Sequence, residues 1–514
     1  MEVPVRQFSV RFMLTAVLFF SAAMLASPVI ASATIEADLV SGTEALGRVT
    51  LGRALDRGPD RPVDLDRLSM STHQITGQVT VIVESVAETG DMPSADDNDY
   101  TRINDAVQAV SVLGDGTTVR LVGFFDWNEE HAAASWALGS DGTAETDDDY
   151  SVLPPWGLED VTIHAQELGD AVIVGPGDLP DLDWETFLLM WGGSYFGWTV
   201  ENLDIRGFDW SIAMFYTTGA DFDGVTIANN SIDVPADVPG NYSAGLGEPW
   251  QNVAIHFAGG VNQSIVGNEI ILRGLEQPDT AIVEEPVKSA QVGMQSNTHG
   301  GDRYDYLLIA DNFVVFDGWQ TEIEEWVYGI WENGHAHTSN IAVVGNAFVN
   351  GHPDNDPAFN LQRAFRVTSH SSEDTTVLYR DNLAVGANIA IHWIGDNYTS
   401  NPPGTVLPVE IVGNTLIDND TGIWVHTDDP VADAAPGSAA PAGPMSKAIV
   451  RHNRLVGNTV AVRSDNAEVN AVENWWGCNE GPGEEGCDDA LYLSLIHISE
   501  PTRPRLVSRM PSSA

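Results

Sequence analysis

Eight short segments between residues 227 and 476 repeat one pattern, an asparagine set among apolar residues. They read Ile227-Ala-Asn-Asn230-Ser-Ile, Ile265-Val-Gly-Asn268-Glu-Ile, Ile309-Ala-Asp-Asn312-Phe-Val, Val343-Val-Gly-Asn346-Ala-Phe, Leu378-Tyr-Arg-Asp-Asn382-Leu, Ile411-Val-Gly-Asn414-Thr-Leu, Ile449-Val-Arg-His-Asn453-Arg-Leu and Ala471-Val-Glu-Asn474-Trp-Trp. We interpret Thr199-Val-Glu-Asn202-Leu-Asp-Ile as an earlier copy. Successive asparagines of the eight are 21 to 44 residues apart. One turn of a parallel β-helix needs about 20 residues, so we expect one coil per asparagine, with loops in the longer steps.

An asparagine at the same corner of every coil has a direct structural use. Neighbouring strands lie about 4.8 Å apart, so stacked side-chain amides can hydrogen-bond to one another and to the turn backbone. Such bonds satisfy polar groups that a tight corner buries. A Gly-Asn turn signal that recurs by chance is the alternative, but nine occurrences in one apolar frame favour a ladder.

This repeat resembles that of right-handed parallel β-helix proteins of the pectin-lyase-like class. The segment Asn474-Trp-Trp-Gly-Cys-Asn-Glu-Gly-Pro482 is similar to a motif found near the end of such repeats. The resemblance covers roughly residues 115–489. It implies an all-β fold, a single-stranded right-handed parallel β-helix, and it implies little about chemistry because one fold can host many functions.

The first 33 residues are typical of a secretory signal peptide. Arg6 and Arg11 precede an apolar run over residues 12–26, and Ala31-Ser-Ala33 is a small-residue cleavage site. The apolar run is too short for a comfortable membrane span. We therefore expect a protein that is secreted or held at the cell surface and that is not inserted into the membrane.

The other end of the chain, residues 493–514, looks like the translation of a sequencing-library adapter. We predict that this segment is an artefact and does not belong to the fold. On this interpretation the natural protein continues beyond the sequence in hand.

The charge of the chain is strongly one-sided. Its formal net charge is −51, and Lys288 and Lys447 are its two lysines. Such a surface repels nucleic acid and anionic membranes and suits a medium rich in salt or divalent cations. It also argues mildly against a polyanionic substrate unless cations bridge the two. We expect a polysaccharide partner, no nucleic acid, and a monomer.

The N-terminal part divides in two. Residues 34–99 are polar and acidic, with one convincing strand over residues 78–83. Residues 100–113 have apolar positions at helical spacing, and we predict a helix that caps the open end of the β-helix domain, residues 100–492. The acidic loop over residues 141–149 has enough oxygen ligands for Ca²⁺, but its spacing does not match an EF-hand loop.

Cys478 and Cys487 are the two cysteines of the chain and lie in a glycine-rich loop after the last repeat. In an exported protein this spacing indicates one small disulfide that closes the loop.

The strand before each asparagine strand carries a second set of columns. A small residue, such as Ala254 or Gly329, is followed by an apolar residue that we expect to face the core, so alternation puts the small column on the outside. One position further on, again facing outward, stand Phe215, His256, Gln295, Trp331, Arg366, His392, Trp424 and Arg463. We predict that Trp331, Arg366, His392, Trp424 and Arg463 bind substrate, since rings stack on sugar faces and forked donors hold hydroxyls or carboxylates. A segment of the chain that covers this face is the competing interpretation.

Six residues after the small position, five consecutive coils carry a titratable side chain. These residues are His299, His335, His370, Asp396 and Asp428. At the rung spacing their side chains would lie about 5 Å apart, close enough to shift one another's pKa and to hold an acid and a base at a glycosidic bond. We predict that they are catalytic, while a metal site and a stacked structural corner stay open as alternatives. The metal requirement is unknown; Ca²⁺ is a candidate cofactor.

Three functions fit this sequence. The first is a secreted carbohydrate-active enzyme, a polysaccharide lyase or glycoside hydrolase that acts on an extended glycan. The second is a non-catalytic surface or adhesin-like module that binds glycans or serves as a stalk, and the third is a structural repeat with covered columns. The Gly-His-Gly and Arg-x-Pro-x-x-Arg patterns of the known pectin-degrading families are absent, so whether the chain is an enzyme stays open.

Overall fold

A computed structural model defines the fold. It describes residues 69–72, 78–137, 151–176, 186–191, 193–215, 221–236, 250–274, 289–298, 303–318, 325–334, 337–351, 361–369, 377–395, 406–427, 445–465, 467–478, 488–492 and 496–499. These residues belong to one compact unit, Asp56–Ala514. The predicted signal peptide lies outside the described residues.

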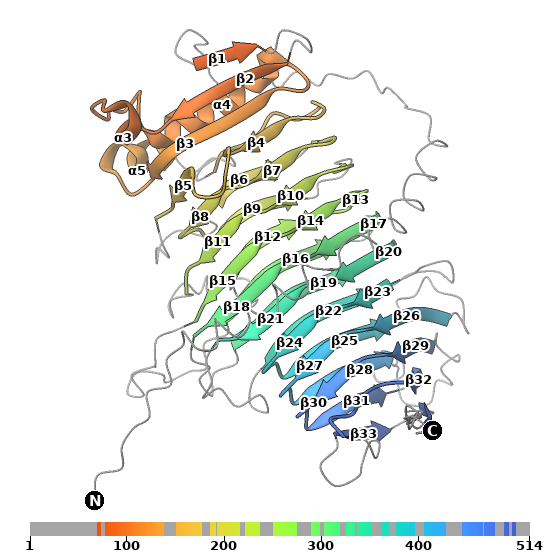
Figure 1. Cartoon of the computed structure of the whole chain (residues 1–514). Helices are drawn as coiled ribbons and strands as arrows, with labels where there is room; N and C mark the ends of the chain where they lie inside the picture. The colour runs from red at the N-terminus through yellow and green to blue at the C-terminus, as the bar shows by residue number, and fades with distance from the viewer. Residues whose placement is uncertain are drawn as a thin grey trace, which may run out of the picture. The chain divides into compact units, whose positions relative to one another are not determined.

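The strands form three parallel sheets that the chain visits in turn (Figure 1). The first sheet contains β2 (Val79–Glu84), β3 (Thr118–Asp126), β4 (Thr162–His164), β7 (Thr199–Glu201), β10 (Thr226–Ala228), β13 (Gly260–Val261), β14 (Ser264–Val266), β17 (Arg303–Ala310), β20 (His337–Val344), β23 (Val377–Arg380), β26 (Val406–Val412), β29 (Met445–Arg451), β32 (Ala467–Val472) and β34 (Ile496–Ser499). The second contains the end of β3, then β5 (Ala171–Val174), β8 (Asp204–Arg206), β11 (Ser231–Val234), β15 (Glu269–Arg273), β18 (Phe313–Asp317), β21 (Ala347–Asn350), β24 (Leu383–Val385), β27 (Thr415–Ile417) and β30 (Arg454–Val456).

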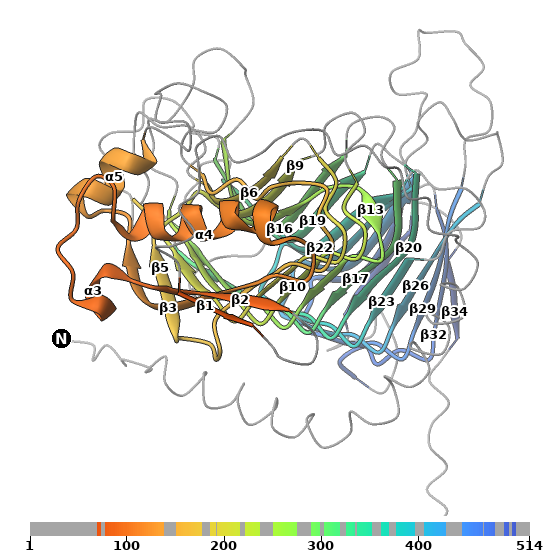
Figure 2. The ribbon, with the colours of Figure 1, turned by 90° about the horizontal axis from the view of Figure 1, so that it is seen from above.

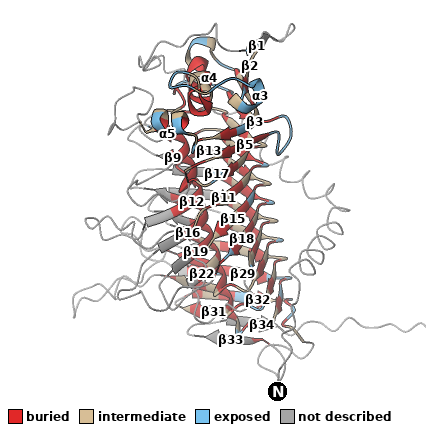
Figure 3. Cartoon of the chain, turned by 90° about the vertical axis from the view of Figure 1, so that its left-hand side faces the viewer, coloured by how far each residue is buried: buried red, intermediate tan, exposed pale blue. Residues whose placement is uncertain are grey.

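The third sheet contains β6 (Thr186–Trp191), β9 (Trp210–Phe215), β12 (Trp250–Phe257), β16 (Ser289–Thr298), β19 (Glu325–Gly334), β22 (Leu361–Ser369), β25 (Ile389–Gly395), β28 (Thr421–Thr427), β31 (Val460–Asp465) and β33 (Asp489–Tyr492). Each strand pairs in parallel with its equivalents in the coils before and after it. The predicted parallel β-helix is confirmed. Its first sheet extends beyond the predicted range of residues 100–492, since β2 pairs with β3, and β34, which lies in the segment that we expected to be outside the fold, pairs with β32. The apolar core runs through the inside of the coils (Figure 3). Buried residues alternate with half-buried ones along strands such as β11 and β23, whereas β25 of the third sheet is buried along its whole length.

A helical cap covers the N-terminal end of the coils. It comprises α3 (Val86–Thr89), α4 (Asp99–Leu113) and α5 (Glu130–Trp136), and α4 packs against β2 and β3 (Figure 2). Asn98 begins α4 with a capping box to Thr101, and Ile103 and Val107 join the core. The predicted capping helix is confirmed. The short strand β1 (Ser69–Thr72) pairs antiparallel with β2 at the outer edge.

The asparagine ladder runs along the corner between the first and second sheets. Each Oδ1 accepts two bonds of 2.9–3.1 Å from the asparagine of the preceding coil, one from its backbone N–H and one from its Nδ2. Each ladder asparagine also donates an Nδ2 hydrogen to a backbone carbonyl of the preceding coil, at 2.8–3.1 Å. The ladder residues Asn230, Asn268, Asn312, Asn346, Asn382, Asn414, Asn453 and Asn474 are all buried. The ladder therefore satisfies backbone groups that the corner removes from water.

Asn202 is not part of this ladder, contrary to our interpretation of the sequence. Leu203 takes the ladder position in that coil and donates its backbone N–H to Asn230 Oδ1 at 3.0 Å. Asn202 stands one residue earlier, in the left-handed conformation with φ of 60°. A residue in that conformation precedes every ladder asparagine, and asparagine adopts it readily, which is why the pattern misled us.

The left-handed column alternates between Asx and glycine over six coils. Asn229, Gly267, Asp311, Gly345, Asp381 and Gly413 occupy it in succession, all with positive φ. A Cβ on Gly267 would lie 2.6 Å from Asn229 Oδ1, and one on Gly345 would collide with Asp311 Oδ1 in the same way. Each Asx side chain thus fills the space that a Cβ of the residue one coil further on would need, so glycine is the residue that fits there.

The small column of the third sheet faces the core, and our prediction that it faces outward is wrong. On β12 both Ala254 and Ile255 belong to the main core, whereas Val253 lies in a separate outer cluster and the His256 ring contacts Trp210 of that cluster. In the pairing of β12 with β16, Val253 and Ile255 have partners but Ala254 has none. The equivalent small residue is likewise left out of the pairing in the later strands. The small residue therefore interrupts the alternation at the same place in each of these strands, without a shift of register, and puts two consecutive side chains inside; we call this shared irregularity the bulge.

Space inside the coil explains why the bulge residue is small. A Cβ on Gly329 would lie 2.8 Å from Cδ2 of the core residue Phe348. Our register at β9 was also wrong by two residues, since Ala213 pairs with His256 and not with Ala254. In every later coil the predicted register of this column is the observed one.

A second, shorter ladder stabilises the corner between the second and third sheets at the C-terminal end. Asn458 Oδ1 accepts from the Asn419 backbone N–H at 3.1 Å and from Asn419 Nδ2 at 2.8 Å. Asp488 Oδ2 takes the same place in the next coil, 2.8 Å from Asn458 Nδ2. We did not predict this ladder, because three coils are too few for a repeat to stand out.

Removal of one ladder side chain should destabilise the whole stack. Asn346→Ala leaves the backbone N–H and Nδ2 of Asn312 without their acceptor in a buried corner, so we expect the free energy of unfolding to fall by about 2–4 kcal/mol. Equilibrium urea unfolding measures it. Asn350→Ala is the matched control, since Asn350 is half-buried and bonds Gly386 O at 3.2 Å; its loss should stay below about 1 kcal/mol. Equal losses in the two variants would contradict the role of the ladder.

The alternation of Asx and glycine predicts that a second substitution restores part of the stability lost by the first. Gly345→Ala should cost about 2 kcal/mol or more, because it adds a clash with Asp311 to the strain of the left-handed backbone. Gly224→Ala, with φ of 70° and its nearest neighbour atom at 3.5 Å, should lose only about 1 kcal/mol. The double variant Asp311→Ala/Gly345→Ala should be more stable than the sum of its two single changes. Additive losses in thermal or urea unfolding would refute the clash.

Candidate functional site

The predicted substrate-binding residues form one continuous column on the outer face of the third sheet. Trp331 on β19 pairs with Arg366 on β22, which pairs with His392 on β25. His392 in turn pairs with Trp424 on β28, which pairs with Arg463 on β31. The five residues therefore stand on consecutive coils at one register position.

The N-terminal half of this column is a stack of rings and guanidinium groups. Tyr328 and Trp331 stack with centroids 4.7 Å apart and planes inclined by 19°. The Arg366 guanidinium carbon lies 5.6 Å from the Trp331 centroid, and that of Arg363 lies 5.7 Å from the Tyr328 centroid. These distances are typical of cation–π contacts. Arg363 and Tyr328 precede the bulge by one residue, so we could not have predicted their outward position without the bulge.

The C-terminal half continues the stack. The His392 and Trp424 rings are 4.6 Å apart and nearly parallel, and the Arg463 guanidinium carbon lies 4.1 Å over the Trp424 ring. Asp465 fixes both partners, since its Oδ2 accepts from Trp424 Nε1 and from Arg463 Nε, each at 2.9 Å. Asp465 follows Arg463 by two residues and therefore shares its face. We had not singled it out from the sequence.

A pair of imidazoles sits beside this stack. His392 Nε2 lies 3.1 Å from His426 Nδ1, and the ring centroids are 5.0 Å apart. Burial lowers the pKa of His392 well below its usual value, and the positive charges of Arg363, His426, Arg366 and Arg463 lower it further. His392 is therefore neutral near pH 7. His426 follows Trp424 by two residues and points to the same side.

Ring faces on this column are occupied by their neighbours. Trp424 lies between the His392 ring and the Arg463 guanidinium. The rung spacing explains this, because planar groups on adjacent strands come into stacking distance of each other. Trp331 stacks one face on Tyr328 of the same strand, and the Arg366 guanidinium carbon lies beside this pair, 5.6 Å from the Trp331 centroid and 5.9 Å from the Tyr328 centroid. A sugar that approaches this face meets the edges of the rings and the polar ends of the arginines, and not the ring faces on which our prediction relied.

Accessibility changes along the column. Trp331 is 7% exposed and His392 is 2% exposed, whereas Arg366, Trp424 and Arg463 are half-buried. The Arg463 side chain keeps 37% of its surface. The most accessible part of the column is therefore its C-terminal end, around Trp424 and Arg463.

The five predicted catalytic residues, His299, His335, His370, Asp396 and Asp428, lie outside the described residues. Each is the residue directly after a strand of the third sheet, and the strand ends are in register, as the pairs Thr298–Gly334 and Gly395–Thr427 show. The predicted spacing of six residues from the small position therefore agrees with the observed register up to the ends of the described strands. Their catalytic role stays a prediction.

Metal ligands were the other open question. In the parts of the chain that the structure describes, no group of three or more His, Cys, Asp or Glu side chains is placed to hold a metal ion. The acidic loop considered for Ca²⁺, residues 141–149, is outside these parts. Cys478 is half-buried and is not a free thiol, while Cys487 is not among the described residues, so their pairing stays a prediction. No described helix has the length and apolar character that a membrane crossing requires.

The chain has a parallel β-helix fold, and several solved structures are similar to it at low sequence identity. It is similar to an alginate lyase solved with a trisaccharide, at 13% identity over 76% of this chain and 79% of that chain, with a TM-score of 0.36. An exopolygalacturonase from Thermotoga maritima is 10% identical over 80% and 89%, with a TM-score of 0.38.

Not every similar structure belongs to an enzyme. PfbA, a surface adhesin of Streptococcus pneumoniae, is 10% identical over 75% of this chain and 92% of its own, with a TM-score of 0.31. No protein-family model and no curated protein matches the sequence. At these identities the likeness concerns the fold, so the function of this chain must be argued from its own side chains.

The buried imidazole predicts a pH dependence of stability. The unfolded chain takes up a proton at His392 below about pH 6.5, whereas the folded protein keeps this ring neutral, so acid favours the unfolded state. Stability from this group is lost as the pH falls from 7 towards 5, by at most about 1.4 kcal/mol per pH unit. In His392→Gln the loss between pH 7 and pH 5 should be smaller than in the wild type by about 1–2 kcal/mol.

Urea unfolding at pH 7, 6 and 5 measures this difference. The control is His452→Gln, which changes a histidine whose side chain is 55% exposed and should leave the wild-type dependence intact. A His392→Gln variant that loses as much stability in acid as the wild type would show that His392 is not neutral in the fold.

Proposed function

We propose that the protein is an exported carbohydrate-active enzyme that binds an acidic polysaccharide along the outer face of the third sheet and cleaves it as a lyase. The observation that supports this is a local reversal of charge. In a chain of net charge −51, the guanidinium groups of Arg363, Arg366 and Arg463 all face His392 closely enough to lower its pKa. A strip of forked cations suits a run of carboxylates spaced along a glycan.

The geometry favours carboxylate recognition over ring stacking. Both faces of Trp424 are engaged by His392 and Arg463, while Trp331 stacks on Tyr328 and is only 7% exposed, so the groups left for a ligand are polar edges. Arg366 and Arg463 are half-buried and carry donors that their stacking contacts do not use. These two arginines would neutralise the carboxylate of a uronate residue.

Neutralisation of the carboxylate prepares β-elimination. It acidifies the proton on C5 of the uronate; a base removes this proton, the C4–O4 bond breaks, a C4–C5 double bond forms, and the departing O4 takes a proton. The His392–His426 pair is the proton-transfer group among the described residues. The proposal assigns His426 Nδ1–H as the donor and the neutral His392 Nε2 as the acceptor of their 3.1 Å contact; in that tautomer His426 Nε2 would accept the proton. The predicted loop residues His335, His370 and Asp396 would supply the acid.

A hydrolase on the same face would instead use a pair of carboxyl groups, and Asp396 and Asp428 are the predicted candidates. Burial of Trp331 and His392 favours a different alternative, a non-catalytic module in which the column stabilises the coils. In that case the chain would serve as a glycan-binding platform or a stalk at the cell surface.

Activity assays separate these functions. We would incubate the full exported chain with alginate, polygalacturonate and a neutral glucan, with and without Ca²⁺, and follow absorbance at 235 nm together with new reducing ends. A lyase raises both signals on an acidic polysaccharide, and a hydrolase raises reducing ends alone. Absence of both signals on every polysaccharide, with the protein folded, would refute catalysis and leave the non-catalytic module.

Variants test the assigned roles. His426→Ala should lower kcat by about 100-fold or more, the range of general acid–base catalysis. Arg366→Ala and Arg463→Ala should lower kcat/KM by about 10–100-fold on the acidic polysaccharide, as loss of a charged hydrogen-bonding group does. Arg273→Ala is the matched control, because Arg273 pairs with Asp233 and Asp317 on the second sheet. Equal losses in Arg273→Ala and Arg366→Ala would contradict the site.

A further inference from the structure

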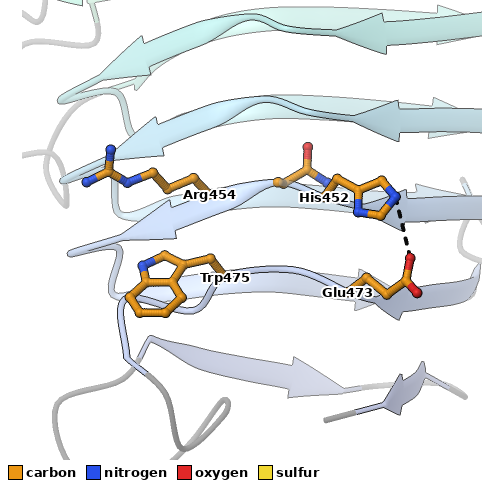
Figure 4. A pocket seen from close by; sticks show the side chains of 5 residues that line it. His452, Arg454, Glu473 and Trp475 are labelled. Atoms are coloured by element: carbon orange, nitrogen blue, oxygen red, sulfur yellow. Dashed lines mark ion pairs between the residues drawn. The ribbon is translucent and has the colours of Figure 1, made fainter. Parts of the chain in front are cut away.

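A hollow lies on a different side of the coils, around the turns that carry the last two ladder asparagines. It has a volume of about 580 Å³ and is lined by His452, Asn453, Arg454, Glu473 and Trp475 (Figure 4). Arg454 and Trp475 begin the second sheet in successive coils and are bridged in parallel. His452 and Glu473 occupy the left-handed position before each asparagine, so all four side chains come from two stacked turns.

The residue types at these turns depart from the rest of the ladder. From Asn202 to Gly413 the left-handed position holds only asparagine, aspartate or glycine, but His452 and Glu473 adopt it with φ of 57° and 59°. Histidine is found in that conformation more often than most residues, but glutamate carries a conformational cost there, and such costs concentrate at functional sites. The two turns thus present large polar side chains where simple turn chemistry would use small ones.

Trp475 is open to solvent in a way that Trp424 is not. It is 41% exposed, and within the described residues no aromatic ring or guanidinium group stacks on its indole. Its neighbour Trp476 is fully buried in the core, so the outward position of Trp475 is not needed to fill the coil. An accessible indole beside polar groups is the arrangement that binds a ring with one apolar face.

Polar groups form the rest of the lining, with Arg454 at the same end as the indole and the His452–Glu473 pair at the other end (Figure 4). His452 Nε2 and Glu473 Oε2 are 3.4 Å apart, and both side chains keep more than half of their surface. Arg454 is exposed. A carboxylate, an imidazole and a guanidinium together accept and donate hydrogen bonds, as vicinal hydroxyl groups require. The charges of Arg454 and Glu473 offset each other, which favours a neutral ligand over a uronate.

We propose that this hollow is a second glycan-binding site, which holds a neutral pyranose ring against Trp475 with its hydroxyl groups on Arg454 and the His452–Glu473 pair. Asn453 stays in the ladder, where its Nδ2 and Oδ1 are bonded. The site is on the corner between the first and second sheets and does not depend on the proposed activity of the third sheet. It would hold the protein on a neutral glycan while the third sheet engages its substrate.

Ligand binding to the full chain tests the proposal. We would titrate cellohexaose, laminarihexaose and mannohexaose, follow saturation-transfer difference NMR signals, and expect at least one to bind with a Kd in the millimolar range or tighter. Trp475→Ala should weaken that binding by about tenfold or more, which corresponds to 1.4 kcal/mol, and Trp475→Phe should retain most of it. Trp191→Ala is the matched control, a tryptophan of 43% exposure on β6, and should bind as the wild type does.

Two further variants separate binding from folding and from the third sheet. Arg454→Ala should weaken the binding with an unchanged melting temperature, because its side chain is exposed. Arg366→Ala, which tests the proposed activity, should leave hexasaccharide binding unchanged. The proposal is overturned if none of the three hexasaccharides binds up to about 20 mM, or if Trp475→Ala and Arg454→Ala bind as tightly as the wild type.

Discussion

A buried corner that recurs in every coil is the constraint on which this structure depends. At that corner the chain turns from the first sheet to the second, and a backbone N–H and a carbonyl lose access to water. The asparagine of the following coil pairs with both, as Asn268 does for the coil of Asn230. Because an unpaired buried backbone group costs as much as a lost hydrogen bond, each coil needs the side chain of the next. Register along the whole stack follows from this single contact.

The same rung spacing that makes the ladder work also shapes the outer face of the third sheet. Planar side chains placed one above another at about 4.8 Å use their faces on each other, so the column from Trp331 to Arg463 offers edges and charged ends to a ligand. Aromatic side chains that would stack on sugars in an isolated binding loop stack instead on one another when they stand on adjacent coils of a solenoid. The bulge adds to this, because it brings Tyr328 and Arg363 to the outside and so widens the cationic strip.

Much of the fold could be predicted from the sequence because the pattern is repeated. The corner asparagines and the register of the third-sheet column from β12 onward each depend on many copies of one local signal, while the capping helix could be predicted from the helical spacing of its own apolar residues. The bulge could not be predicted, since a small residue followed by an apolar one looks like ordinary alternation until the core packing around Phe348 is known. The ladder position of Leu203 and the second ladder of Asn419, Asn458 and Asp488 were not predicted for a different reason, because each occurs in too few copies to be recognised as a repeat. The predicted residues that follow the third-sheet strands, from His299 to Asp428, stand where coils differ most in length, and repetition says least about such loops.

The alternation of Asx and glycine before the ladder has a consequence for how such a chain can grow. From Asn229 to Gly413 an Asx side chain occupies the space beside the residue one coil further on, so the structural unit along this corner is two coils and not one. A gene segment that encodes a single coil, duplicated or deleted in this region, would bring two Asx residues or two glycines into adjacent coils. Segments that encode an even number of coils avoid this mismatch. In this region the solenoid should therefore lengthen and shorten most easily by pairs of coils, because the turn residues of one column alternate with a period of two coils.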